Sequence, residues 1–312
     1  MLLFYHFANY NRLMPLRTGR FFVYSIPADL WMIIVVLLWG LNFVIMKNAL
    51  LEIPPPLFVT LRFSAGSLLM LAILRYQHGP ISLPKRDYKQ LILLGLVGNA
   101  AYQSMFIWGL KYTSAANGSL IINATPIVVG FLGALWGIER MRLGLALALL
   151  LGFTGVLIVL LPNRSSVSAM NFQGDLLMVG SMLSWAIYTL GVRRYATGMD
   201  PIYLTTWTIV FGTLCLVIFN GMSVFEAQWS LYSFAAWFGL AYSIIGSLII
   251  SYLLWNMSVQ RVGGVRTTIY ISMIPLVAAL SAWVALGEAI TVYHLLGGIL
   301  IFFSFRLAQR TA

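Results

Sequence analysis

Long apolar runs separated by short polar links are the feature that most constrains this chain. A helix needs about 20 mostly apolar residues to cross a lipid bilayer. Only helices and closed barrels satisfy the backbone inside lipid, and unbroken apolar runs lack the alternating pattern of barrel strands. We therefore predict an all-α integral membrane protein with ten transmembrane helices. The runs lie at roughly 30–49, 57–74, 90–110, 114–137, 143–161, 174–192, 201–219, 232–257, 265–286 and 291–306.

The composition leaves little material for a water-soluble domain. Of the 312 residues, 61% are hydrophobic and 9% are charged, whereas soluble domains carry roughly 25% charged residues. The net charge of +11 is scattered over the ends of the apolar runs, so we expect no nucleic-acid partner. The single cysteine, Cys215, excludes a disulfide framework and a cysteine metal site. We expect a lipid bilayer and a small-molecule substrate as partners, no cofactor and no metal; the oligomeric state is left open and includes a monomer.

The lysines and arginines predict how the helices are oriented. If the N-terminus lies in the cytoplasm, 15 of the 19 basic residues fall on the cytoplasmic side, as the positive-inside rule requires. We therefore expect a multi-pass protein of the cell inner (plasma) membrane with both termini in the cytoplasm. Asn9, Asn11 and Arg12 interrupt the first apolar stretch, so residues 1–28 are expected to form a cytoplasmic or interfacial arm rather than a cleaved signal.

Two apolar stretches far apart in the chain share the same spacing of a proline and a glutamate. In each, a proline inside the run is followed thirteen residues later by a glutamate where the run ends: Pro126 by Glu139, and Pro275 by Glu288. A shift of 149 residues superimposes the two stretches. This correspondence indicates an internal repeat.

Other matches extend the repeat over most of the chain. A shift of 146 residues pairs Trp39 with Trp185 near the start of each half. We predict two five-helix repeats, residues 29–162 and 172–310. Because five is odd, the second repeat enters the membrane upside down. Inverted repeats allow a carrier to alternate between outward-open and inward-open states around a central site.

These features carry a family resemblance. Ten helices in two repeats of about 145 residues, a proline in the fourth and ninth helices with a glutamate at their ends, and Leu-Arg-Phe at 61–63 resemble the EamA-type branch of the drug/metabolite transporter superfamily. The resemblance covers nearly the whole chain from residue 29. It implies a secondary transporter that exports small metabolites such as amino acids from the bacterial cytoplasm, coupled to an ion or solute gradient.

The third predicted helix gives the clearest indication of a substrate cavity. Asn99, Tyr102, Gln103 and Phe106 are spaced i, i+3, i+4, i+7 and share one helix face. Side-chain amides at this depth are costly if they face lipid, so they face protein or a wet cavity. Matching or neighbouring polar and aromatic positions complete the set of cavity candidates: Trp39, Asn42, Asn123, Trp185, Tyr188, Ser251, Tyr252, Trp255 and Tyr270.

Such a cavity suits a zwitterion with an apolar or aromatic side chain. Two plainer interpretations stay open. The amides can instead bond between helices and hold the bundle together, and the aromatic rings can be simple packing or part of an interfacial belt.

The two prolines and the two glutamates each allow a functional and a structural interpretation. Pro126 and Pro275 kink their helices and free the carbonyls of Ile122 and Ile271. Those carbonyls can accept a hydrogen bond from a substrate amine, or be satisfied by Asn123, Ser272 or a neighbouring helix. Glu139 and Glu288 are gate candidates, although helix-end carboxylates often contribute little.

Charges inside the predicted spans are scarce. Arg62 lies about five residues into the second helix, and its long side chain can reach outward to the interface. The family resemblance implies a packing role for Arg62 rather than a ligand role. No Asp or Glu falls at mid-membrane, which disfavours proton coupling through a central carboxylate.

Other classes of membrane protein fit less well. An intramembrane enzyme needs a zinc motif, a nucleophile elbow or paired aspartates, and we find no catalytic residues of these kinds; the three histidines are widely separated. A channel needs rings of charge or a filter loop. A nucleotide-sugar, nucleoside or drug-type carrier of the same superfamily stays open as the alternative function.

Overall fold

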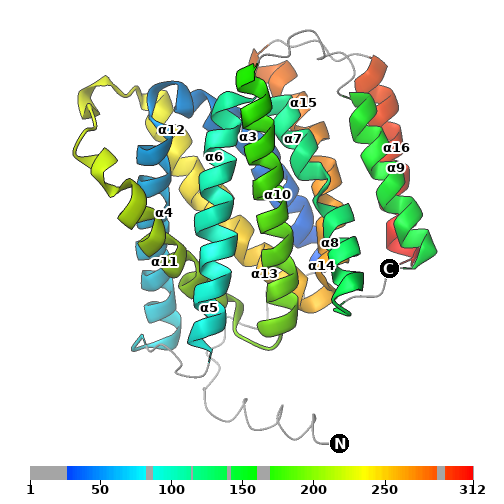
Figure 1. Ribbon diagram of the computed structural model, residues 1–312, viewed down its shortest axis with the longest axis horizontal. Coiled ribbons are helices and arrows are strands. Elements are labelled where there is room, and N and C mark those ends of the chain that lie inside the picture. The colour runs from blue at the N-terminus through cyan, green and yellow to red at the C-terminus, as the bar shows by residue number, and fades with distance from the viewer. Residues whose placement is uncertain are drawn as a thin grey trace, which may run out of the picture.

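Every regular element in the described part of the chain is helical. The computed structural model describes residues 27–81, 87–113, 115–138, 142–159, 169–286 and 292–311, which form a bundle of long helices (Figure 1). In chain order the elements are α3 (Ala28–Glu52), α4 (Pro55–His78), α5 (Tyr88–Gly95), η1 (Leu96–Ala101), α6 (Tyr102–Tyr112), α7 (Ala115–Asn123), α8 (Thr125–Leu135), α9 (Leu143–Val159), α10 (Ala169–Tyr195), α11 (Pro201–Asn220), η3 (Gly221–Val224), η4 (Trp229–Leu231), α12 (Phe234–Tyr242), η5 (Ser243–Ile250), α13 (Ser251–Val262), α14 (Gly264–Ile269), η6 (Tyr270–Met273), α15 (Ile274–Leu286) and α16 (Val292–Thr311).

Six stretches of described helix are long and apolar enough to cross a membrane. They are Ala28–Glu52, Pro55–His78, Tyr88–Tyr112, Phe172–Tyr195, Pro201–Val224 and Phe234–Val262. Shorter apolar helices occupy the windows expected for the fourth, fifth, ninth and tenth spans: Ile121–Leu135, Leu143–Gly155, Gly264–Ala278 and Leu295–Ser304. The all-helical, membrane-type architecture is confirmed, whereas ten crossings in two inverted repeats stay a prediction.

Two of the shorter helices are interrupted next to their prolines. Before Pro126, α7 ends at Asn123 and α8 begins after a turn at Ala124. Before Pro275, the 3₁₀ segment η6 joins α14 to α15. A proline removes a backbone donor and crowds the preceding turn, which explains both interruptions.

Two of the long helices contain a π-helical segment. η1 continues from α5 into α6, and η5 continues from α12 into α13. A π segment adds a residue to the turn, so it rotates the side chains on one side of it relative to those on the other. Both segments carry buried polar side chains, Asn99 in η1 and Ser247 in η5.

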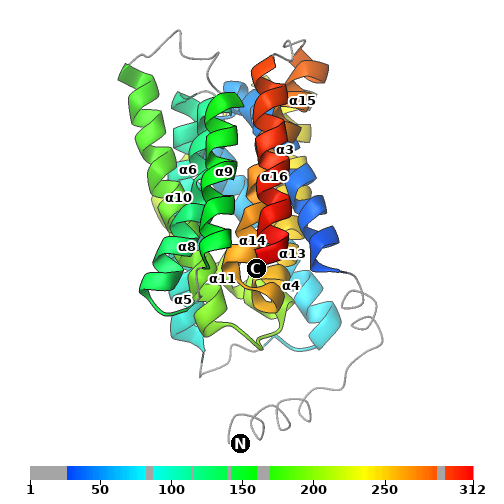
Figure 2. The same cartoon turned by 90° about the vertical axis from the view of Figure 1, so that its right-hand side faces the viewer.

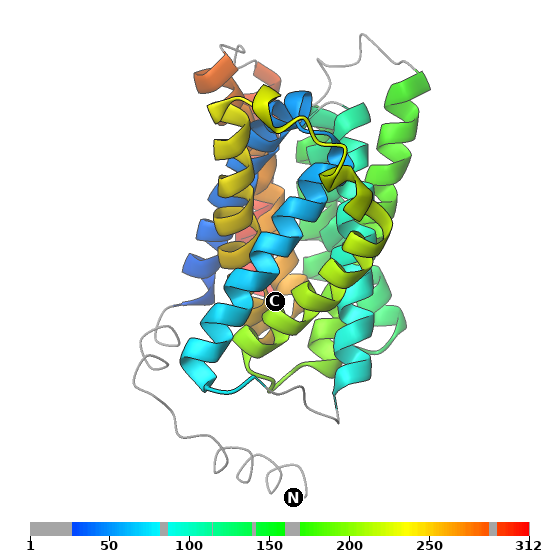
Figure 3. The ribbon, with the colours of Figure 1, turned by 90° about the vertical axis from the view of Figure 1, so that its left-hand side faces the viewer.

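Small side chains let neighbouring helices approach closely. α9 and α16 run side by side (Figure 2), and a Cβ added to Gly152 would lie 2.7 Å from Ser304 Oγ. Ser304 Oγ donates a hydrogen bond to the Ala148 carbonyl at 2.6 Å. α4 and α11 also lie side by side (Figure 3), joined by a hydrogen bond from Thr213 Oγ1 to the Phe63 carbonyl at 3.1 Å.

Both the interior and the outer face of the bundle combine aliphatic and aromatic side chains. The largest side chains that are almost fully buried include Trp31, Trp185, Trp255, Arg62 and Tyr188. Large apolar side chains stay exposed on the outside, a distribution that suits lipid rather than water as the surrounding solvent. α3 begins and α16 ends toward the same end of the bundle (Figure 1).

Candidate functional site

A small cavity lies between α3, α4, α6, α10 and η5, near the interruptions of the fourth and ninth helical regions. Its volume is about 30 Å³, which holds roughly two water molecules. Described residues of these elements, together with single residues of α7, α13, η6 and α15, line it: Trp39, Asn42, Phe43, Arg62, Tyr102, Gln103, Phe106, Ile122, Trp185, Ser247, Tyr252, Ile271 and Ile274.

Aromatic rings form one part of the cavity wall. Trp185 is at their centre, with its ring centroid 4.8 Å from Tyr102, 5.1 Å from Tyr252 and 5.3 Å from Trp255. Trp39 meets Trp185 edge-on at 5.6 Å. Trp39 Nε1 donates a hydrogen bond to the Ser247 carbonyl at 3.0 Å, which fixes the orientation of the indole. This part of the wall is therefore apolar, because the N–H of Trp39 already donates to a backbone carbonyl.

A polar network forms the other part of the wall. Gln103 Nε2 donates to the Tyr252 hydroxyl at 2.7 Å, and Arg62 Nη1 donates to Gln103 Oε1 at 3.0 Å. Arg62 also donates from Nη2 to Ser247 Oγ at 3.0 Å and from Nε to the Ser243 carbonyl at 3.1 Å. The network links α4, α6, η5 and α13 across the middle of the bundle.

The position of Arg62 differs from the outward reach expected from the sequence. Only 1% of its surface is exposed, and its guanidinium lines the cavity. The neutral acceptors provided by Ser243, Ser247 and Gln103 draw the side chain inward. Ser243 and Ser247 lie more than 180 positions from Arg62 in the sequence. The sequence pattern around Arg62 therefore cannot predict these contacts.

Seven of the thirteen cavity candidates line the cavity. These are Trp39, Asn42, Tyr102, Gln103, Phe106, Trp185 and Tyr252. The structure adds six lining residues that sequence reasoning did not select as cavity candidates: Phe43, Arg62, Ile122, Ser247, Ile271 and Ile274.

The other candidates lie outside the lining. Asn99 donates from Nδ2 to the Thr208 carbonyl at 3.0 Å, which joins η1 to α11. Tyr188 donates to Asn256 Oδ1 at 2.9 Å, and Ser251 Oγ donates to the Gly246 carbonyl at 2.8 Å. For Asn99 the plainer interpretation, an amide that bonds between helices, matches this contact; the Tyr188 hydroxyl also bonds between helices. Trp255 packs its ring against Trp39 and Trp185, behind the wall.

The carbonyls freed by the two prolines already accept hydrogen bonds from protein donors. Thr125 Oγ1 donates to the Ile122 carbonyl at 2.5 Å, and Asn123 Nδ2 donates to the Ile271 carbonyl at 3.3 Å. The second bond joins the fourth helical region to the ninth. Both isoleucines line the cavity, so the interruptions shape its wall.

Tyr270 makes a contact at the end of the bundle where α3 begins. Its hydroxyl donates to Asp29 Oδ1, and Arg266 Nη2 lies 3.8 Å from the same oxygen. Asp175, which matches Asp29 at a shift of 146 residues, accepts instead from Thr113 Oγ1 at 2.5 Å. The gate candidates Glu139 and Glu288 lie outside the described residues.

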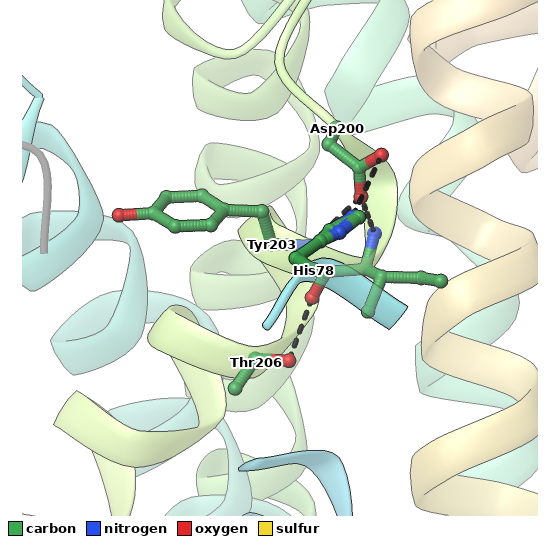
Figure 4. Close-up of polar contacts among 5 residues, drawn as sticks. His78, Asp200, Tyr203 and Thr206 are labelled. Carbon is green, nitrogen blue, oxygen red and sulfur yellow. Dashed lines mark hydrogen bonds and ion pairs between the residues drawn. The ribbon is translucent and has the colours of Figure 1, made fainter. Parts of the chain in front are cut away.

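An ion pair fastens α4 to the start of α11 (Figure 4). His78 Nε2 lies 3.6 Å from Asp200 Oδ2, while Asp200 Oδ1 accepts from the backbone N–H groups of Ile202 at 2.9 Å and Tyr203 at 3.1 Å. Asp200 is therefore the N-cap of α11. None of these residues lines the cavity, so this cluster serves the fold.

A larger hollow of about 290 Å³ lies on the flank of the bundle, between residues such as Leu93, Trp136, Ile187 and Tyr195. Those side chains are exposed on the outer surface of the bundle. We place the candidate site at the smaller cavity because polar groups from several helices converge there. Among the residues that the structure describes, no group of three or more His, Cys, Asp or Glu is placed to hold a metal ion.

Comparison with known proteins gives a consistent result. The family model described as the EamA-like transporter family matches the chain twice, over residues 26–161 and 172–308. The chain is 26% identical over 265 residues to the "uncharacterized transporter YyaM" of Bacillus subtilis, covering 84% of this chain and 87% of the relative. It is 28% identical over 270 residues to an "uncharacterized transporter" of Archaeoglobus fulgidus, covering 85% and 91%.

A solved crystal structure shares the fold. It aligns with a TM-score of 0.76 over 91% of this chain and 98% of its own, at 18% sequence identity. The relatives are named as transporters, and the chain has multiple apolar helices. It is a multi-pass membrane transporter, and it belongs to the EamA-like transporter family.

Proposed function

We propose that this protein is a secondary transporter that exports small metabolites, namely amino acids or related amphipathic compounds, by alternating access. The proposed location is the cell inner (plasma) membrane, with both termini in the cytoplasm. The observation that carries the proposal is the central cavity, where amide, hydroxyl and aromatic groups from both halves of the chain converge. Convergent polar groups in an otherwise apolar pocket are typical of small-molecule sites.

Matched features in the two halves support an inverted repeat of residues 29–162 and 172–310. Lys47 Nζ donates to the Lys111 carbonyl at 3.4 Å, at the end of α6. Arg193 Nη1 donates to the Gln260 carbonyl at 3.0 Å, at the end of α13. Lys47 and Arg193 correspond at a shift of 146 residues, and the carbonyls of Lys111 and Gln260 correspond at a shift of 149 residues.

The interrupted helices match in the same way. The π segment η1 ends at Ala101 and its counterpart η5 ends at Ile250. The break before Pro126 falls at Ala124, and the 3₁₀ segment η6 before Pro275 ends at Met273. Both pairs of positions are 149 residues apart. Two halves with the same hinges at the same places suit a carrier that exposes one site to either side in turn.

The contact between Tyr270 and Asp29 is the proposed latch at one end of the bundle. Asp175, the counterpart of Asp29, accepts from Thr113, the residue after α6, instead of from the fourth helical region. The two halves therefore differ at this contact, as expected when one end is held closed. Glu139 and Glu288 stay proposed gate residues.

The cavity has to widen when a substrate binds. A volume of about 30 Å³ holds water molecules but not an amino acid. Trp39, Tyr102 and Trp185 close much of the space, so we propose that these rings separate as the helices move. The conformation described here is then an occluded, unloaded state.

Counterflow in proteoliposomes tests the proposal. Vesicles are loaded with an excess of one compound from a panel of amino acids, amines, nucleosides, nucleotide sugars and drug-like cations, and uptake of the labelled compound is followed. Exchange of amino acids above the rate in protein-free vesicles supports the proposal. Exchange limited to nucleosides, nucleotide sugars or cations would replace the proposed substrate class with the alternative.

A further inference from the structure

Arg62 is the charged group of the cavity. Among the described residues that line the cavity, it alone carries a charge. Its guanidinium is almost completely buried. A buried cation inside a membrane protein is costly unless an anion or a full set of acceptors compensates it.

The contacts of Arg62 leave that charge uncompensated. Its three hydrogen-bond acceptors are neutral: the Ser243 carbonyl, Gln103 Oε1 and Ser247 Oγ. Within the described ranges, no carboxylate oxygen lies within 4.0 Å of the guanidinium, since the ion pairs found there involve other residues. The positive charge therefore faces the cavity without an anionic partner from this part of the chain.

The guanidinium also retains hydrogen-bonding capacity. Arginine has five N–H donors, and Arg62 uses three of them in the bonds above. One N–H on each terminal nitrogen has no acceptor among the described residues. A carboxylate or a phosphate matches these donors, because two of its oxygens can accept from the guanidinium fork.

We propose that Arg62 binds the carboxylate of the transported compound, so that the carrier requires a singly charged carboxylate. This inference rests on the proposed function, because it assigns a recognition role within the same cavity. One cation matches one carboxylate, whereas a phosphate ester carries up to about two negative charges and calls for further basic groups. The rings of Trp39 and Tyr102 line the same cavity. Aromatic rings attract an ammonium group, so an amino acid suits the cavity as a zwitterion.

A purely structural role for Arg62 makes a different prediction. As a clamp that joins α4, α6 and η5, the side chain would govern folding and would leave the choice of substrate unaffected. The distinguishing readout is therefore the dependence of transport on the charge of the substrate rather than the rate alone.

The test is a set of matched competitors in the counterflow assay. Phenylalanine, leucine and threonine are each compared with their amide, which keeps the amino group and lacks the carboxylate, and with the corresponding decarboxylated amine. We expect the amides and the amines to compete roughly tenfold or more weakly than the acids, the loss expected when a charged hydrogen bond is removed.

Variants attribute this preference to Arg62. In Arg62→Gln we expect the amide to compete as well as the acid, and in Arg62→Lys we expect the preference for the acid to persist. Lys47→Gln is the matched control, because Lys47 caps α6 through the Leu110 and Thr113 carbonyls at 2.5 and 2.7 Å and does not line the cavity. It should keep the preference for acids.

The outcomes separate the two proposals. If amides and amines exchange as well as acids, or if Arg62→Gln keeps the preference, the inference on Arg62 is overturned while the transporter proposal stands. If no amino acid exchanges, both fail. Should Arg62→Gln not fold, thermal unfolding of the wild-type protein decides: acids should raise the unfolding temperature and amides should not.

Discussion

Gln103 donates a hydrogen bond to the hydroxyl of Tyr252, 2.7 Å away, and the two residues stand 149 positions apart at matching places in the two halves of the chain. The bond crosses the centre of the bundle at the wall of the cavity. Because Gln103 also accepts from Arg62, a change at this one amide alters both the junction of the halves and a contact of the buried guanidinium.

Gln103→Glu introduces an internal carboxylate beside Arg62, whose Nη1 lies 3.0 Å from the present Oε1. The new carboxylate should form an ion pair with the guanidinium and so compete with the carboxylate of the substrate. We expect exchange of amino acids to fall roughly tenfold or more without loss of thermal stability. Counterflow and thermal unfolding in detergent measure the two effects. Gln228→Glu, at an exposed loop position, is the control, and unchanged exchange in Gln103→Glu would argue that Arg62 has no contact with substrate.

Asp200→Ala removes the N-cap of α11 together with its pairing to His78. Loss of an N-cap costs about 0.5–2 kcal/mol, and we expect the free energy of unfolding to fall by that amount. Asp200→Asn should retain most of the stability because asparagine also caps helices. Denaturant unfolding in micelles makes the comparison, and an equal loss in both variants would assign the effect to the ion pair instead.

Gly98→Ala tests the close packing of η1 against α10. A Cβ at this position would lie 2.1 Å from Tyr188 Cδ2, so the substitution forces a shift that costs about 1–3 kcal/mol. At Gly221 the nearest atom to an added Cβ is 3.5 Å away, and Gly221→Ala should change little. Thermal unfolding of the two variants should therefore differ clearly; equal stability would mean that η1 and α10 separate easily.

Tyr270→Phe removes the bond to Asp29 and should weaken the proposed latch. Loss of one hydrogen bond of about 1 kcal/mol shifts the open population roughly fivefold. In a Cys215→Ser background, a cysteine at Ile274 in the cavity wall should then react faster with a reagent added on the Asp29 side. Tyr293→Phe, at an exposed position on α16, is the control and should leave the labelling rate unchanged. An unchanged labelling rate in Tyr270→Phe would mean that the contact with Asp29 does not hold this end closed.

The positions of the helices could be predicted because apolar length is a local property of the sequence. The expected run 57–74 lies within α4 (Pro55–His78), and the run 201–219 nearly coincides with α11 (Pro201–Asn220). Trp39 and Trp185 are both cavity candidates from the sequence, and the structure places their rings 5.6 Å apart in the lining of one cavity.

The details of the site depended on contacts that a local pattern does not contain. Asn99 has the helical spacing of Gln103, but Asn99 lies within the π segment η1 and bonds to Thr208 on α11 instead of facing the cavity. Arg62 turns inward because Ser243 and Ser247 meet it from the other half of the chain. A periodic pattern assumes a regular helix and neglects partners from distant segments.

Counterflow of amino acids by Gln103→Ala, measured beside Gln228→Ala, tests the central claim most directly. Gln103 stands in the cavity wall and Gln228 in an exposed loop, so the same change is made inside and outside the site. We expect exchange by Gln103→Ala to be strongly reduced while the protein still inserts and folds, and exchange by Gln228→Ala to match the wild type. Wild-type exchange in correctly folded Gln103→Ala would contradict a substrate site in this cavity.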